Sequence, residues 1–397
     1  MFSLEHTSVG CFQQRISSDD TDSGEYIFEI ESMLDNTTLV TSMSDNSLTL
    51  SNSADLRTIA KTSAHSSTIN RIEASKVNPH LLFSCSDDRK TLGWDTRCFD
   101  KPALVINQSE EVTALSVGVN GTLMATASES KINFYDIRFF NGGSSTGQRA
   151  GKLGSYADVH SDMITQLKFH PIKTQLLTSA AEDGLICIYD TSTSETEEAI
   201  VSVLNTECPV NKFGYFGVDY EGIYSLSTVE TLSFWHYPSA QRVAHFPTIR
   251  EGLNADYLVD CYNIPNTNEI YLLAGDYNGQ GVIAQMEPNG FNVKSYLTGG
   301  HSANMRCCSA NFMSPTPIGG VRLITGGEDS RLCSWTTTNT ATSNNIVSNS
   351  LTTSNVGNNN QGNSRSSGSV GGGRVHGTGN THMKAKKDST KIRFKPY

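Results

Sequence analysis

The chain has 397 residues, which is enough for two or three ordinary domains or for one large all-β domain with tails. Its 30 Lys and Arg residues against 40 Asp and Glu residues give a formal net charge of −10. No run of about 18 apolar residues is present to span a membrane, and no apolar segment follows a basic start as in a secretory signal. We therefore expect a protein of the cytoplasm, the nucleus or both.

The charge is divided unevenly along the chain. Residues 337–397 contain eight basic residues and one acidic residue, a net charge of +7, which leaves −17 for the remaining residues. An acidic body disfavours non-specific binding to nucleic acid through its own field. We expect nucleic-acid contact only through the basic tip HMKAKKDSTKIRFKP (382–396), and a solvated tail is the commoner outcome for such a run.

Residues 1–24 form a polar N-terminal segment with one weak apolar patch, from Val9 to Phe12. The edge strand of a sheet presents unpaired backbone groups, and folds built from repeated sheets often cover the last edge with an N-terminal strand. We expect residues 8–16 to supply the closing strand of the last sheet.

From Glu25 to Trp335 the chain consists of short apolar or alternating segments such as LICIYD and LITGG. These segments are about five to seven residues long and are separated by Gly, Asn and Asp, which is the pattern of strands joined by turns. Apolar residues do not follow helical spacing over more than a few residues. The sequence therefore predicts an all-β fold.

The strand pattern repeats. The third strand of each unit ends on a marker position, and five successive markers lie 43, 41, 54 and 46 residues apart: Ser51, Trp94, Tyr135, Tyr189 and Trp235. A four-stranded WD blade takes roughly 40–45 residues. The 100 residues from Trp235 to Trp335 hold two units, the first of which (YLVDCYNI, EIYLLAGD, GVIAQM) lacks an aromatic marker. We predict a seven-bladed WD40-type β-propeller over residues 25–336.

Two segments fall outside this repeat. The longest interval contains FFNGGSSTGQRAGKLGSY (139–156), whose glycines and serines predict a loop. Residues 337–397 are rich in Asn, Ser, Thr and Gly and poor in large apolar side chains. Such a segment cannot bury enough surface to offset the entropy lost on ordering, so we expect a disordered C-terminal tail.

Three units share a set of four polar positions. In WD propellers a His, a Ser or Thr, an Asp and a Trp or Tyr at these positions satisfy one another in a buried hydrogen-bond network. A Ser, His and Asp in contact also describe a hydrolase triad, but recurrence in several units and the lack of a G-x-S-x-G motif favour a structural role. We therefore predict no catalytic site. The sets are His65, Ser84, Asp88 and Trp94; His160, Ser179, Asp183 and Tyr189; His301, Thr325, Asp329 and Trp335.

Motifs for metals and cofactors are not found in the sequence. The nine cysteines form no CxxC pair and read as free thiols of a reduced compartment. His80 and His170 stand beside prolines, without a Cys or carboxylate at ligand spacing. No Walker, HExxH or dinucleotide-binding motif is present. We expect no metal and no cofactor.

Two consecutive units end on an Asp-x-Arg motif, Asp95-Thr96-Arg97 and Asp136-Ile137-Arg138. Substrate receptors of a cullin-4 ubiquitin ligase use this motif to bind the adaptor of the ligase. In many other propellers the Arg simply pairs with its own Asp or a neighbouring one. A ligase receptor is therefore the alternative to a plain scaffold, and Arg97 and Arg138 would carry it.

A second candidate surface is the wide face around the central channel. Loops held by a rigid scaffold are the usual place for recognition. We expect other proteins to bind here to a monomeric propeller that works within complexes. The charged turns on this face carry Asp87, Arg89 and Lys90 in the second blade and Glu328, Ser330 and Arg331 in the seventh.

Several longer stretches are more specific than the general repeat: LGSYADVHSDMITQLKFHP (153–171), EDGLICIYD (182–190), TIRE (248–251) leading into DYLVDCYN, LTGGHSANMR, and LITGGEDSRLCSW. In these stretches the chain resembles the eukaryotic group of WD repeat-containing protein 89, over about residues 25–336. The resemblance implies a propeller in a soluble intracellular protein and implies no known activity. Tyr189 in place of Trp, and the bare markers of blades one and six, depart from a full repeat.

Overall fold

The computed structural model describes residues 14–15, 24–138, 151–312 and 321–336. These residues belong to one compact unit, Met1–Thr340. The expected tail and most of the N-terminal segment lie outside the described residues. None of the helices within the described ranges is long and apolar enough to cross a membrane.

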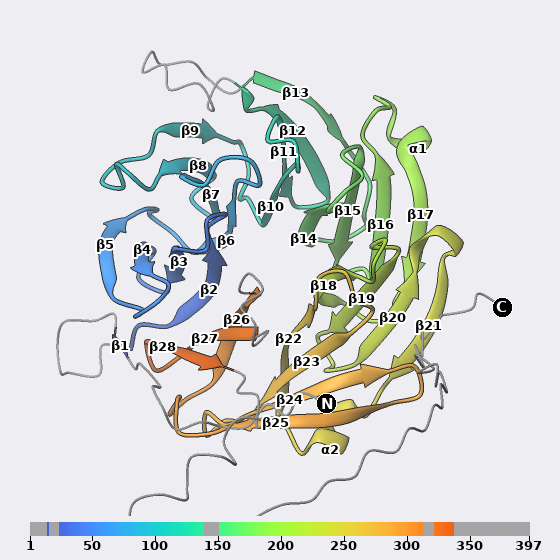
Figure 1. Cartoon of the computed structure of the whole chain (residues 1–397). Helices are drawn as coiled ribbons and strands as arrows, with labels where there is room; N and C mark the ends of the chain where they lie inside the picture. The colour runs from blue at the N-terminus through green and yellow to red at the C-terminus, as the bar shows by residue number, and fades with distance from the viewer. Residues whose placement is uncertain (1–13, 16–23, 139–150, 313–320, 337–397) are drawn as a thin grey trace, which may run out of the picture. The chain divides into compact units, whose positions relative to one another are not determined.

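The described strands form seven antiparallel sheets of four strands each (Figure 1). In six sheets the four strands are consecutive in the chain, because each short turn returns the chain beside the strand it has just completed. The predicted seven-bladed, all-β propeller is thus confirmed.

Blade one consists of β2 (Ile27–Ser32), β3 (Thr38–Met43), β4 (Ser47–Asn52) and β5 (Thr58–Ser63). Blade two consists of β6 (Ile69–Ala74), β7 (Leu81–Ser86), β8 (Lys90–Asp95) and β9 (Leu104–Asn107). Blade three consists of β10 (Ala114–Val117), β11 (Leu123–Ser128), β12 (Lys131–Asp136) and β13 (Gly151–Tyr156). Blade four consists of β14 (Ile164–Phe169), β15 (Leu176–Ala181), β16 (Leu185–Asp190) and β17 (Ile200–Asn205). The short helix α1 (Thr196–Ala199) precedes β17.

Blades five and six consist of β18 (Val210–Phe216), β19 (Gly222–Ser227), β20 (Leu232–His236) and β21 (Gln241–Phe246), and of β22 (Tyr257–Asn263), β23 (Ile270–Gly275), β24 (Gly281–Glu287) and β25 (Gly290–Leu297). Blade seven consists of β26 (Met305–Phe312), β27 (Val321–Gly327), β28 (Arg331–Thr336) and β1 (Gln14–Arg15). A 3-10 turn, η2 (Tyr237–Ser239), and a short helix, α2 (Ile249–Leu253), lie in and after blade five.

The first strand of each blade lies on the inside of the ring and contacts the first strands of the two neighbouring blades. The contacts run from β2 through β6, β10, β14, β18 and β22 to β26, which contacts β2 again (Figure 1). The ring therefore closes where the inner strands of the first and last blades pack together. The inner strands line a central channel.

The outer strand of blade seven comes from the N-terminal segment. Gln14 lies opposite Leu332 and Arg15 opposite Arg331 in an antiparallel pair of β1 with β28. This pairing covers the edge that β28 would otherwise expose. The other residues of the segment expected to close the ring, 8–13 and 16, lie outside the described residues.

The loop predicted at residues 139–156 is wrong at its C-terminal end. Residues Gly151–Tyr156 form β13, which pairs with β12 as the outermost strand of blade three. Residues 151–154 are exposed, so most of this strand needs no apolar alternation. Backbone pairing with β12 and the buried side chain of Tyr156 hold it in place. Residues 139–150 lie outside the described residues.

The apolar core is divided among the interfaces between neighbouring blades. One cluster joins Leu48 and Leu50 of blade one to Ile72, Leu82 and Trp94 of blade two. Because each such cluster draws on two blades, each blade is stabilised by its neighbours.

Candidate functional site

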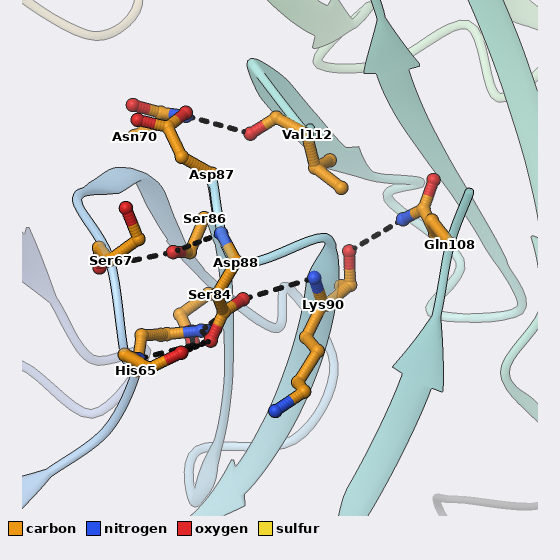
Figure 2. A network of polar contacts seen from close by, with 12 residues as sticks. His65, Ser67, Asn70, Ser84, Ser86, Asp87, Asp88, Lys90, Gln108 and Val112 are labelled. Atoms are coloured by element: carbon orange, nitrogen blue, oxygen red, sulfur yellow. Dashed lines mark hydrogen bonds and ion pairs between the residues drawn. The ribbon is translucent and has the colours of Figure 1, made fainter. Parts of the chain in front are cut away.

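The predicted polar set of blade two is assembled in the structure. His65 precedes β6, Ser84 lies in β7, Asp88 in the following turn and Trp94 in β8. The His65 Nδ1 atom is 3.0 Å from Asp88 Oδ2, and Nε2 is 2.8 Å from Ser84 Oγ (Figure 2). The indole N–H of Trp94 donates to Ser84 Oγ at 2.9 Å. Because an ionised carboxylate only accepts, Nδ1 donates to Asp88 and the neutral Nε2 accepts from the hydroxyl.

Blade four contains the same arrangement. His160 Nδ1 lies 3.0 Å from Asp183 Oδ2, and its Nε2 lies 2.7 Å from Ser179 Oγ. The hydroxyls of Ser179 and Tyr189 are 3.1 Å apart, so Tyr189 takes the place of the indole.

Blade seven contains the third set, with a threonine in place of serine. His301 Nδ1 is 3.0 Å from Asp329 Oδ1, and its Nε2 is 2.8 Å from Thr325 Oγ1. Trp335 donates to the same Thr325 hydroxyl at 2.9 Å. Blade five retains part of this pattern, because Trp235 donates to Ser225 Oγ at 3.1 Å.

Burial affects the pKa values of the histidines in the networks of blades two and four. Burial lowers the pKa of His65 and of His160, although the adjacent carboxylate opposes the shift. Burial alone would raise the pKa of Asp88, but hydrogen bonds from the Ser66 amide and from His65 bring it below its usual value. Both shifts favour a neutral imidazole and an ionised carboxylate in the His65–Asp88 pair.

The hydroxyls of Ser84, Ser179 and Thr325 have no exposed surface. The side chains of the three histidines are likewise fully buried. A nucleophile must reach its substrate, whereas these groups are enclosed and already hydrogen-bonded to one another. The geometry therefore favours their use as internal braces that hold a turn to two strands.

The two Asp-x-Arg motifs lie where β8 and β12 end, at the end of the blades opposite the turn that carries Asp88. Arg97 donates to both carboxylate oxygens of Asp95, from Nε at 2.9 Å and from Nη2 at 2.6 Å. Arg138 Nε lies 2.9 Å from Asp136 Oδ2. The arginine side chains are 65% and 66% exposed. Each motif thus presents a guanidinium whose direction is fixed by its own Asp.

The candidate side chains on the wide face differ in their exposure to solvent. We call this face the turn face, because the turn between β7 and β8 lies on it. Arg89 is exposed at the tip of the β7–β8 turn. Arg331 is only 22% exposed, and its Nη1 donates to the Gly300 carbonyl at 3.3 Å. Ser330 is buried, and its hydroxyl bonds to the carbonyl of Glu25. The remaining turn residues named for this face, Asp87, Lys90 and Glu328, are partly buried.

Sequence reasoning missed a group of charged side chains on the inner strands. Each follows a shift of register between the first and second strands of its blade, and such a bulge redirects the side chains that follow it. They line the channel. The sequence feature that could have revealed them is a charged residue inside an otherwise apolar first strand, as in IFEIES or INRIEA. The clearest cases are Glu29, Arg71, Lys212 and Asp260.

These polar side chains connect each blade to the next. Glu29 Oε2 accepts from the Ile72 amide at 2.8 Å, and Gln166 Oε1 accepts from the Phe213 amide at 2.7 Å. Lys212 Nζ donates to the Val259 carbonyl at 3.0 Å. Inner strands of neighbouring blades do not pair as a sheet, so their backbone groups need such partners.

His170, a further fully buried histidine, caps the turn after β14. Its Nδ1 accepts from the Ile172 and Lys173 amides at 3.2 and 3.0 Å. Burial, followed by the nearby Lys173 charge, lowers the pKa of His170 to about 4. Within the described ranges no cluster of three or more His, Cys, Asp or Glu side chains is placed to hold a metal.

The low pKa of His170 predicts a loss of stability in mild acid. The ordinary pKa of a histidine is 6.5 and the pKa of folded His170 is about 4, so between these pH values the unfolded chain binds the proton more tightly. Lowering the pH from 7 to 5 should therefore cost about 2 kcal/mol of unfolding free energy through this residue. Urea titrations of wild type and His170→Asn at both pH values check this. The variant keeps a turn acceptor and should lose less stability on acidification; an equal loss would contradict the assignment.

Seven four-stranded blades and the repeated His, Ser or Thr, Asp, and Trp or Tyr sets define this chain as a WD-repeat β-propeller protein. The family model "WD domain, G-beta repeat" matches residues 152–190, which contain the complete blade-four network.

Individual proteins match a larger part of the chain than this family model does. The chain is 28% identical to WD repeat-containing protein GTS1 of Arabidopsis thaliana, over 80% of this chain and 83% of the plant protein. It is 29% identical to the WD repeat-containing protein 89 homolog of Dictyostelium discoideum, over 70% of this chain and 74% of that protein. The resemblance to the WD repeat-containing protein 89 group is thereby confirmed. A 28% match to GATOR2 complex protein Wdr59 of Drosophila melanogaster covers 36% of this chain and 14% of that protein.

Proposed function

We propose that the protein is a non-catalytic scaffold that binds other proteins through the faces of the propeller. The observation that supports this most strongly is the burial of all three Ser or Thr, His and Asp sets, whose imidazoles have no exposed surface. The turns and loops at the two ends of the blades, by contrast, carry exposed charges on a closed and rigid ring. This is the usual arrangement of a recognition platform.

Arg89 is the side chain through which we expect the turn face to bind. Arg89→Glu should remove a subset of the proteins that co-purify with the wild type, as measured by affinity purification with quantitative mass spectrometry. Reversal at Arg331 is a poorer test, because this side chain supports its own blade through Gly300. The matched control is Arg57→Glu. Arg57 lies in blade one at the opposite end of the propeller from Arg89, and its side chain is 80% exposed. An unchanged set of partners in Arg89→Glu would remove this face from the proposal.

The alternative function is that of a substrate receptor of a cullin-4 ubiquitin ligase. It is favoured by two neighbouring blades that each present a pre-oriented, two-thirds exposed guanidinium at the same end of the ring. The double variant Arg97→Ala with Arg138→Ala should then lose the ligase adaptor on co-purification. Arg57→Ala, which removes an exposed arginine paired with Asp55, should keep it. Equal adaptor recovery in all three proteins would exclude the receptor function.

A further inference from the structure

The outer strands of the blades form the rim of the ring, and within the described residues each pairs with one strand only. The free edge of such a strand presents backbone N–H and C=O groups to which another extended chain can pair, and proteins guard it with a charged side chain or by keeping the strand short. The outer strands β9 and β1 are short, with four and two residues. The outer strands β5, β13, β21 and β25 each contain a basic residue: Lys61, Lys152, Arg242 and Lys294.

Strand β17, the outer strand of blade four, has neither protection. Its six residues, IVSVLN, carry no charge, and it pairs with β16 alone on the outside of the ring (Figure 1). Three of its β-branched side chains are exposed: Ile200 by 39%, Val201 by 52% and Val203 by 42%. The strands β5, β9, β13, β21 and β25 each expose one large apolar side chain. The edge of β17 is therefore both the least guarded and the most apolar of the longer outer edges.

The other side chains of β17 hold the strand in place against blade five. Leu204 is fully buried in a core cluster with Phe213 and Trp235. Ser202 Oγ donates to the Tyr237 carbonyl at 2.8 Å. Because β17 is already ordered in this way, a chain that pairs with it loses its own freedom but does not have to order the strand as well.

Negative charge lies at both ends of β17. The exposed residues Glu195, Glu197 and Glu198 precede the strand, and the exposed Glu207 follows it. Arg242 of blade five lies 3.7 Å from Glu207 and offsets one of these charges. Between residues 174 and 211 the chain itself contains no Lys or Arg. A segment that pairs with β17 is therefore favoured if basic residues flank its apolar part.

The same charges disfavour a second copy of this chain at the edge. If two β17 strands paired antiparallel in regular register about Ser202, Glu197 of one copy would lie opposite Glu207 of the other. Like charges directly opposite each other destabilise a pair of strands. The complementary occupant is thus a different protein.

We propose that the edge of β17 binds an extended segment of a partner protein, in which β-branched residues alternate with polar ones and Lys or Arg residues flank them. The segment would add to blade four as a fifth strand: backbone hydrogen bonds supply affinity, while Val201, Val203 and the flanking glutamates supply selectivity. This rim site is separate from the faces at the two ends of the blades, so failure of either proposal leaves the other in place.

The test uses the full chain and the fluorescein-labelled peptide KKITVTVKK as the probe. Fluorescence anisotropy should show saturable binding that weakens with salt, and the peptide should slow amide exchange in β17 but not in β21. Val203→Lys introduces the guard that the other long outer strands have. It should weaken binding about fivefold or more, because an apolar cross-strand pair is lost and a like charge meets the peptide. The matched control is Val243→Lys in β21, where the valine is 41% exposed, and it should bind as the wild type does.

Two further probes separate strand pairing from charge attraction. The peptide KKITPTVKK lacks one backbone N–H and should bind more weakly, whereas EEITVTVEE should not bind. Equal binding by the proline peptide, equal binding by Val203→Lys, or no binding by the wild type would overturn the proposal. So would a wild-type dimer in sedimentation that Val203→Lys dissociates, because a second copy would then occupy the edge. If Val203→Lys does not fold, the double variant Glu197→Lys with Glu198→Lys decides, and unchanged affinity for KKITVTVKK would count against the site.

Discussion

Trp94→Ala is expected to lower the free energy of unfolding by about 3–5 kcal/mol, the usual cost of truncating a buried Trp. Trp94 is 1% exposed and lies in the core between blades one and two, with its ring centroid 5.8 Å from that of Phe99. The same substitution removes the donor to Ser84. The loss therefore combines a cavity at a blade interface with a broken hydrogen-bond network.

Urea unfolding followed by far-ultraviolet circular dichroism measures this loss. Trp94→Phe keeps most of the ring volume without the N–H and should fall between the wild type and Trp94→Ala. Ser84→Ala removes the hydroxyl shared by His65 and Trp94 and should cost about 1–3 kcal/mol. Because the two residues share one network, the double variant should lose less than the sum of the single losses. An unchanged midpoint for Trp94→Ala would refute the role assigned to the network.

The ring could be predicted because the sequence pattern that specifies each blade lies within one short, continuous stretch of the chain. Each blade is a meander of strands joined by short turns, so marker residues such as Trp94 and Trp235 return at the length of one blade. The networks were predictable for the same reason: His65 and Asp88, like His160 and Asp183, are 23 residues apart within a single repeat. Strand β13 escaped prediction because its first four residues are exposed and leave no apolar pattern.

The channel charges escaped prediction because their partners lie in another blade. Glu29 meets the amide of Ile72, 43 residues away, and Gln166 meets Phe213, 47 residues away. Such contacts follow from which inner strands face each other around the ring and not from spacing within one repeat. The position of Arg331 escaped prediction for another reason: its Nη1 donates to the carbonyl of Gly300 within the same blade, which leaves the side chain only 22% exposed.

Glu29→Ala is expected to cost about 3 kcal/mol, the lower end of the range for removing one partner of a buried ion pair. The side chains of Glu29 and Arg71 are 21% and 23% exposed, so solvent screens the pair only in part. The substitution leaves the Arg71 charge without its carboxylate and the Ile72 amide without its acceptor. Because β2 and β6 are not paired as a sheet, few other polar contacts can replace these two.

Two variants separate the charge from the hydrogen bond in this contact. Glu29→Gln keeps an acceptor for Ile72 and should lose less than Glu29→Ala. Glu197→Ala, at an exposed position in α1, should change the urea midpoint little. If Glu29→Ala is no worse than Glu197→Ala, channel charges do not join the blades. If it is worse, amide exchange should also quicken in β2 and β6 before it does so in blade five, because the opening begins where the contact between blades is lost.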